Sequence, residues 1–118
     1  MPIYRCARCL AADISADAHP ARALRGNDLV DLFVCRECYR PAELAFRIAC
    51  ETSGVPYTPL TRREGLRRLA LFYRDRLDAW ADPAALLDDA ERERATRPIR
   101  AALDEVERRL RVQPLAES

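Results

Sequence analysis

Four cysteines in two closely spaced pairs are the residues of this chain best suited to chemistry. Cys6 and Cys9 form one Cys-x-x-Cys pair, and Cys35 and Cys38 form a second pair after twenty-five intervening residues. A two-residue gap lets both thiolates of a pair reach one ion, and two pairs complete the closed tetrahedral shell of four sulfurs that Zn²⁺ favours in structural sites. The spacing therefore predicts one structural Zn²⁺ held by all four cysteines. Such a closed shell leaves no position at which the metal could activate water.

Other interpretations of the cysteines stay open at this point. Four thiolates also suit iron, as in rubredoxin-like centres. The pairs could instead be redox dithiols or a chance spacing. Structural disulfides are disfavoured, because the N-terminus MPIYRCARC lacks the features of a signal peptide and reducing compartments do not sustain disulfides. We therefore expect a cytoplasmic protein, in which no apolar run approaches the ~18 residues of a membrane helix.

Turn and helix signals surround the second cysteine pair. Residues 21–24 and 29–34 flank a run of turn-forming residues and predict a β-hairpin. This run consists of Gly26, Asn27 and Asp28. Residues 41–51 open with a proline, which a first helical turn tolerates, and predict a short helix that ends before Gly54.

Apolar side chains point to both sides of this short helix, so we expect it to be buried. They are Leu44, Phe46, Ile48 and Cys50. Cys50, the fifth cysteine, is expected to be a small core residue, because only Arg47 offers the positive neighbour that a reactive thiol needs.

The chain has a Cys-x-x-Cys pair (a zinc knuckle), a hairpin, and a second knuckle that leads into a helix. This order resembles the treble-clef zinc finger, over roughly residues 4–52. Cys6 and Cys9 match the first knuckle of that family, and Cys35 and Cys38 match the knuckle that enters its helix. The resemblance implies a zinc-binding fold and says little about function, because function depends on the site rather than on the fold.

One treble-clef branch, the HNH nucleases, is enzymatic. That resemblance implies a catalytic histidine after the first knuckle, then an asparagine, and often a histidine after the last cysteine, around a second metal. His19 and Asn27 occur in this order, but they are only eight positions apart and Tyr39 occupies the last position. Asp17 and Asp28 are the remaining candidate ligands. Hydrolysis needs a positioned base and metal, so we expect no enzymatic activity and keep a degenerate HNH-like nuclease as an alternative.

A stretch rich in proline and glycine divides the chain. Residues 53–59 contain Gly54, Pro56 and Pro59, which neither a helix nor a strand accommodates easily. All cysteines precede this stretch. We therefore predict a four-cysteine zinc-binding head at residues 1–54, a linker at 55–60 and a helical tail at 61–118.

The tail opens on a strong helix signal. Thr61 and Glu64 have the spacing of a capping box. An apolar stripe at three- and four-residue spacing follows, made of Leu66, Leu69, Ala70, Tyr73, Leu77 and Trp80. Leu71 and Phe72 lie off this stripe, so the helix is expected to have a second packing partner.

Two prolines mark the rest of the tail. Asp82 and Pro83 predict the cap and first turn of a further helix. Pro98 is expected to end or kink that helix, because its ring clashes with the carbonyl of Arg94. A second apolar stripe follows, made of Ile99, Ala102, Leu103, Val106 and Leu110. We expect two long helices with a shorter one between them.

An arginine cluster at the start of the tail is the candidate partner-binding site. It consists of Arg62, Arg63, Arg67 and Arg68. Arginine suits phosphates, and cations at a helix N-terminus are mildly unfavourable, which suggests a role beyond helix stability. Yet the formal net charge of the 118-residue chain is only +1. That is a weak electrostatic basis for direct binding of DNA. All the basic residues except one histidine are arginine, so chemistry that needs a lysine is excluded.

Together these features predict an α+β protein that is mostly helical, with a small treble-clef-like head and two or three tail helices. We expect a non-enzymatic, zinc-stabilised binding or adaptor module. It would be an accessory or regulatory factor of nucleic-acid machinery such as transcription, and would bind a protein partner through the tail. Direct nucleic-acid binding is one alternative. A homo-oligomeric scaffold is another, because charges of alternating sign along residues 88–109 suit an interface between helices.

Overall fold

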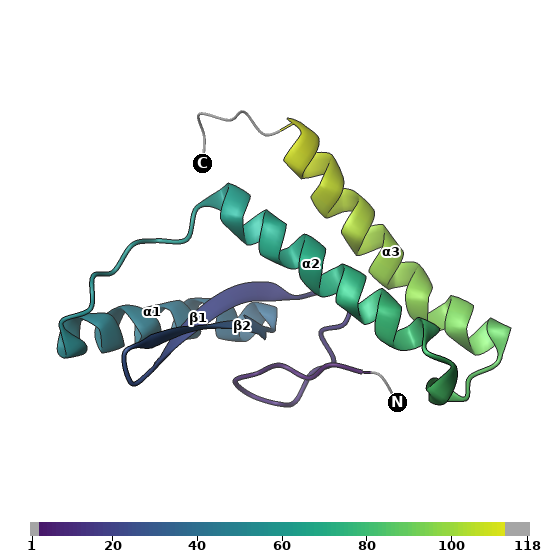
Figure 1. Cartoon of the computed structure of the whole chain (residues 1–118), viewed down its shortest axis with the longest axis horizontal. Helices are drawn as coiled ribbons and strands as arrows, with labels where there is room; N and C mark the ends of the chain where they lie inside the picture. Colours follow the sequence, from purple (N-terminus) through teal and green to yellow (C-terminus); the bar gives the residue numbers. More distant parts are fainter. Residues whose placement is uncertain (1–2, 113–118) are drawn as a thin grey trace. The chain divides into compact units, whose positions relative to one another are not determined.

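The computed structural model describes residues 3–112, which form two compact units (Figure 1). The first unit, residues 5–60, contains β1 (His19–Arg25), β2 (Asp28–Val34) and α1 (Arg36–Ser53). The second unit, residues 3–4 and 61–112, contains α2 (Arg62–Ala81), the 3-10 helix η1 (Pro83–Ala85) and α3 (Asp89–Val112). These elements confirm the predicted α+β class with mostly helical content. No helix within residues 3–112 is both long and apolar enough to cross a membrane.

The predicted hairpin is confirmed in the first unit. Arg25 pairs with Asp28 across a two-residue turn, and the antiparallel register continues to the pair of His19 and Val34. Gly26 opens the turn with a φ of 67°, a left-handed conformation that glycine adopts without steric cost. Helix α1 packs against β1. The small core of this unit includes Ala21, Val34, Ala42, Phe46 and Cys50.

Helix α1 starts earlier than predicted. It begins at Arg36, so Pro41 lies inside the helix rather than in its first turn. Cys35 is the N-cap residue and Cys38 lies in the first turn. The second cysteine pair therefore itself starts the helix. Proline removes only one backbone hydrogen bond at this position, and the helix continues because its inner face is buried against the hairpin.

The expectation that the whole of α1 is buried is wrong. Phe46 and Cys50 are buried, but Leu44 is 58% exposed and Ile48 is 52% exposed. A two-stranded hairpin covers only one face of the helix, so the apolar residues on the opposite face stay in contact with solvent.

In the second unit, α2 and α3 pack against each other as an antiparallel helical hairpin. The hydroxyl of Thr61 accepts a hydrogen bond from the backbone N–H of Glu64 at 3.1 Å, which confirms the predicted N-cap. Arg63 Nη1, at the start of α2, donates to the carbonyl of Leu110 near the end of α3 at 3.5 Å. At the other end of α2, the carbonyl of Trp80 accepts from the Arg92 side chain at 2.8 Å. Both predicted apolar stripes contribute to the core between the helices, with Leu66, Ala70, Tyr73, Trp80, Ile99, Leu103 and Val106 buried.

Phe72 has a packing partner within the same unit that the sequence did not indicate. The Phe72 ring is buried and meets Tyr4 edge-to-face, with ring centroids 4.9 Å apart. Leu71, by contrast, is 66% exposed. A second packing partner was expected for the residues that lie off the apolar stripe. Phe72 has such a partner, which is Tyr4 in the N-terminal segment.

The predicted end of a helix at Pro98 is wrong, because α3 runs through this residue from Asp89 to Val112. The short helix expected after Pro83 is only the 3-10 helix η1, in which the Asp82 side chain accepts from the N–H of Ala84 at 2.9 Å. An interior proline costs about 3 kcal/mol. Burial of Ile99, Leu103 and Val106 against α2 stabilises the helix by roughly 1.5 to 3 kcal/mol for each residue. This gain outweighs the cost of the proline, so the helix is continuous.

Pro98→Ala is accordingly expected to stabilise the second unit. Pro98 is exposed, so alanine restores the missing N–H donor without disturbing the core, and we expect the free energy of unfolding to rise by about 1 to 3 kcal/mol. Trp80, the only tryptophan in the chain, is buried in this unit, so its fluorescence during urea unfolding reports the change. A lower urea midpoint for the variant would show that the proline does not strain α3.

Candidate metal centre

The four predicted cysteine ligands converge on one point in the first unit. The Sγ atoms of Cys6, Cys9, Cys35 and Cys38 all lie within 4.8 Å of one another. Those of Cys9 and Cys35 are 3.9 Å apart. Four sulfurs at the Zn–S bond length of ~2.3 Å in a tetrahedron would be about 3.8 Å apart. The sulfurs are therefore placed to bind a single metal ion.

Backbone hydrogen bonds hold the first cysteine pair in place. The N–H of Cys6 donates to the carbonyl of Ala12 at 2.9 Å, and the N–H of Leu10 donates back to the carbonyl of Cys6 at 3.0 Å. Leu10 has a φ of 62°, a left-handed conformation that costs a non-glycine residue energy and reverses the chain direction. The N–H of Ala7 donates to the carbonyl of Phe33 at 3.1 Å, which joins this loop to β2.

The second pair is positioned by the junction of β2 and α1. Cys35 follows directly after Val34, the last residue of β2, and caps α1. The N–H of Cys38 donates to the carbonyl of Cys35 at 3.1 Å, which turns both side chains to the same side. The hairpin therefore carries the chain from the first pair to the second, and the helix start completes the set.

Hydrogen bonds to sulfur are concentrated on the two buried ligands. Burial raises the pKa of the Cys6 thiol, but the backbone N–H groups of Cys9, Cys35 and Arg8 donate to its sulfur at 3.3 to 3.4 Å. Together these bonds lower the pKa of Cys6 to about 6. The sulfur thus receives the donors that stabilise a thiolate.

Arg8 is a neighbour of the centre that the sequence did not single out. Its Nη1 donates to Cys38 Sγ at 3.7 Å, which lowers the pKa of Cys38, whereas burial and the neighbouring sulfurs of Cys35, Cys6 and Cys9 raise that pKa to about 11. Sulfurs this close cannot all ionise without a compensating cation, and a bound divalent ion would supply that charge. The only sequence signal for Arg8 is its position between the two cysteines of the first pair.

The four cysteines of the centre differ in their exposure to solvent. Cys6 and Cys38 are buried, Cys35 is half-buried and Cys9 is exposed. Cys50 is completely buried in the core of the unit, where the sequence predicted it. It is not a member of the metal cluster.

The residues that follow the order of the HNH-nuclease motif, His19 and Asn27, are not brought together. His19 is the first residue of β1, and Asn27 lies in the turn after that strand, so they occupy opposite ends of it. The His19 ring lies 5.6 Å from the Tyr39 ring, and His19 Nε2 is 3.6 Å from Asp17 Oδ1. Within residues 3–112, the four cysteines are the only group of three or more histidine, cysteine or acidic side chains placed to hold a metal.

The four arginines of the cluster differ in their exposure to solvent. Arg62 and Arg67 are exposed, whereas Arg63 and Arg68 are half-buried. Arg63 donates to the carbonyl of Leu110, so its charge lies near the C-terminal end of α3 as well as the N-terminus of α2. A cation is favourable near the last carbonyls of a helix, which explains its otherwise unfavourable place in α2.

A network around Arg22 was also not predicted. Glu43 Oε1 accepts hydrogen bonds from Arg22 Nη2 at 3.0 Å and from the Tyr57 hydroxyl at 2.5 Å. The bond to Glu43, with burial, raises the pKa of Tyr57. Arg22 also donates to the carbonyl of Thr58 at 2.9 Å. Tyr57 and Thr58 lie in the segment predicted as a linker. These hydrogen bonds connect Thr58 to β1 and Tyr57 to α1.

Comparisons of the whole chain with protein-family models, with curated proteins and with solved structures give no match.

Proposed function

We propose that the first unit is a treble-clef-like zinc head in which Cys6, Cys9, Cys35 and Cys38 hold one structural Zn²⁺. Soft thiolates at tetrahedral spacing suit this ion, and the order of knuckle, hairpin, knuckle and helix suits the fold. When bound, the ion supplies folding free energy to a unit whose core is too small to be stable alone.

On this basis the protein is a non-enzymatic binding or adaptor module. The convergence of four sulfurs is the observation that carries the proposal, because a closed shell stabilises a fold and offers the metal no catalytic position. The module would act as an accessory or regulatory factor of nucleic-acid machinery such as transcription.

The contact is assigned to a protein partner of the second unit. The formal charge of +1, less four for the thiolates and plus two for Zn²⁺, gives about −1 for the loaded protein, and a negative protein binds nucleic acid poorly. Arg62 and Arg67 are exposed at the start of α2 and are the side chains assigned to the partner. Arg63, which donates to Leu110, has a structural role instead.

A pull-down from the native host, with and without nuclease treatment, tests this proposal. The bait is the full chain, compared with the double variant Arg62→Gln/Arg67→Gln and with Arg94→Gln/Arg111→Gln, which loses the same charge from exposed positions of α3. We expect a protein partner that survives nuclease and is lost only with the first double variant. Loss of all bound material after nuclease would favour direct nucleic-acid binding. A dimer or tetramer mass by light scattering with no captured partner would favour the scaffold.

A further inference from the structure

The first unit contains a cavity of about 290 Å³ between the hairpin and α1, which is open to solvent and lies beside the metal centre. Its walls are apolar, with Leu24 and Leu32 from the strands and Phe46 from the helix. Three alanines of α1 also line it, Ala42, Ala45 and Ala49. Small side chains along one side of a helix leave room where larger ones would fill the space, so the hollow has the apolar character of a ligand pocket, near the lower end of the usual size range.

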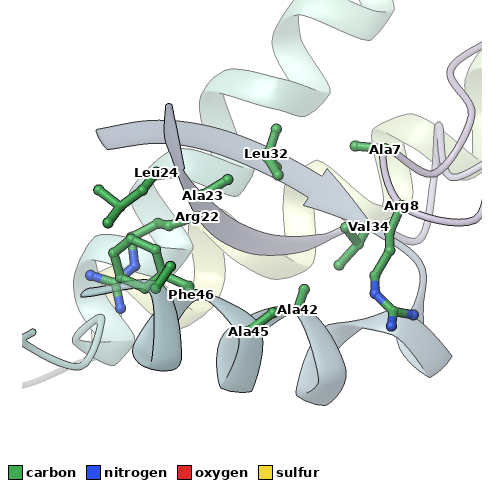
Figure 2. Close-up of a pocket in the computed structure, with 11 residues that line it drawn as sticks. Ala7, Arg8, Arg22, Ala23, Leu24, Leu32, Val34, Ala42, Ala45 and Phe46 are labelled. Carbon is green, nitrogen blue, oxygen red and sulfur yellow. The ribbon is translucent and has the colours of Figure 1, made fainter. Parts of the chain in front are cut away.

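Two arginines lie at opposite ends of this cavity, with Arg22 beside Phe46 and Arg8 near the end of β2 (Figure 2). The Arg22 side chain is only 10% exposed. Its guanidinium lies over the Phe46 ring, 4.5 Å from the centroid. Arg22 Nη1 and Nη2 have acceptors in Thr58 and Glu43, but its Nε is buried and has no hydrogen-bond acceptor among the described residues. A buried N–H without an acceptor costs about 1 to 3 kcal/mol, so an oxygen that reaches this atom after a small shift of the Arg22 or Phe46 side chain would be favoured.

The charge of each arginine is already balanced. Glu43 pairs with Arg22 at 3.0 Å, and Arg8 donates to Cys38 Sγ at the edge of the thiolate cluster. Neither end therefore favours an anion, and the thiolates near Arg8 would repel one. What both ends offer is N–H donors. The complementary occupant is neutral, is apolar in the middle and carries a hydrogen-bond acceptor at each end.

The volume limits the size of the part of the occupant that enters the cavity. At ~30 Å³ per water-sized group, 290 Å³ holds on the order of ten non-hydrogen atoms. A leucine-sized side chain with its two flanking peptide carbonyls has about this size, is neutral and carries two acceptors.

We propose that this cavity is a recognition site for an apolar residue of a peptide, whose side chain lies over the α1 alanines and whose flanking carbonyls accept hydrogen bonds from Arg8 and Arg22. The site belongs to the first unit and does not depend on the partner assigned to α2. The Arg62→Gln/Arg67→Gln variant should therefore leave peptide binding unchanged, which separates the two proposals.

The experiment uses the full metal-loaded chain and N-acetyl-leucinamide as the probe, followed by NMR titration of the backbone amides. A ligand of this size is expected to bind with a Kd on the order of 1 mM, with the largest shifts at Ala42, Ala45 and Ala49. N-acetylglycinamide lacks the side chain, and N-acetyl-leucine adds a negative charge, so both should bind more weakly.

Two variants test the geometry. Ala45→Leu should fill the cavity and weaken binding at least about tenfold. Ala101→Leu, the same change at an exposed position of α3, should alter binding by less than about twofold. Arg8→Met removes one donor and should weaken binding several-fold in protein that retains its metal. The inference is overturned if the probe shows no saturable binding, if Ala45→Leu binds as well as the unchanged protein, or if N-acetyl-leucine binds as tightly as the amide.

Discussion

Cys35→Ser is expected to abolish stoichiometric metal binding and to unfold the first unit, while α2 and α3 stay folded. Structural zinc sites contribute about 10 to 16 kcal/mol of apparent free energy in small peptides. Whole domains are stable by only about 5 to 15 kcal/mol, so the core around Ala21, Val34 and Phe46 cannot compensate for the loss. The second unit has its own core and carries no ligand of the centre.

Two signals separate the units in this experiment. Trp80 fluorescence reports only the second unit and should be unchanged, whereas far-UV circular dichroism should lose roughly the share of helix that α1 contributes. Cys50→Ser is the matched control, because it changes a buried cysteine outside the metal cluster and should retain metal at a cost of about 1 to 3 kcal/mol. Retention of metal and of the full far-UV helical signal by the Cys35 variant would refute the role assigned to this ligand.

Ile99→Ala is expected to give the largest loss of stability in the second unit. Ile99 is 1% exposed on the face of α3 that packs against α2, and removal of a buried isoleucine side chain typically costs about 2 to 5 kcal/mol. Metal content should not change, because the residue belongs to the other unit.

Urea unfolding followed by Trp80 fluorescence measures this effect, with elemental analysis of the same samples. Leu71→Ala is the control, because Leu71 is an aliphatic residue of α2 that is mostly exposed, and it should change the free energy of unfolding by less than about 0.5 kcal/mol. Equal effects of the two substitutions would show that Ile99 is not part of a packed core between the helices.

The metal cluster and the start of α2 could be predicted from the sequence because each has a clear pattern of residue types and spacing. The spacing of Cys6, Cys9, Cys35 and Cys38 reflects the reach of thiolates around one ion, and the cap at Thr61 involves residues three positions apart. The turn at Gly26 is similarly local, since it depends on a residue that adopts positive φ.

What the sequence did not reveal depends on contacts between distant residues. The passage of α3 through Pro98 depends on burial against α2, which outweighs the local cost of proline. The partner of Phe72 is Tyr4, far away along the chain. The exposure of Leu44 and Ile48 depends on how little of α1 a two-stranded hairpin can cover. No local pattern carries this information.

The placement of charge was predictable only in part. The cluster from Arg62 to Arg68 is obvious in the sequence, but which of its side chains face solvent depends on the packing of α3, as Arg63 shows by donating to Leu110. Arg8 and Arg22 lie outside that cluster. Each is paired with a group distant along the chain, Cys38 or Glu43, so neither was recognisable as part of a site.

Elemental analysis of the full chain, purified under native conditions without added metal, tests the central claim most directly. We expect one zinc per chain and no iron, with the zinc lost in Cys35→Ser and retained in Cys50→Ser. Protein that is folded and monodisperse but contains neither zinc nor iron would contradict a metal-stabilised head.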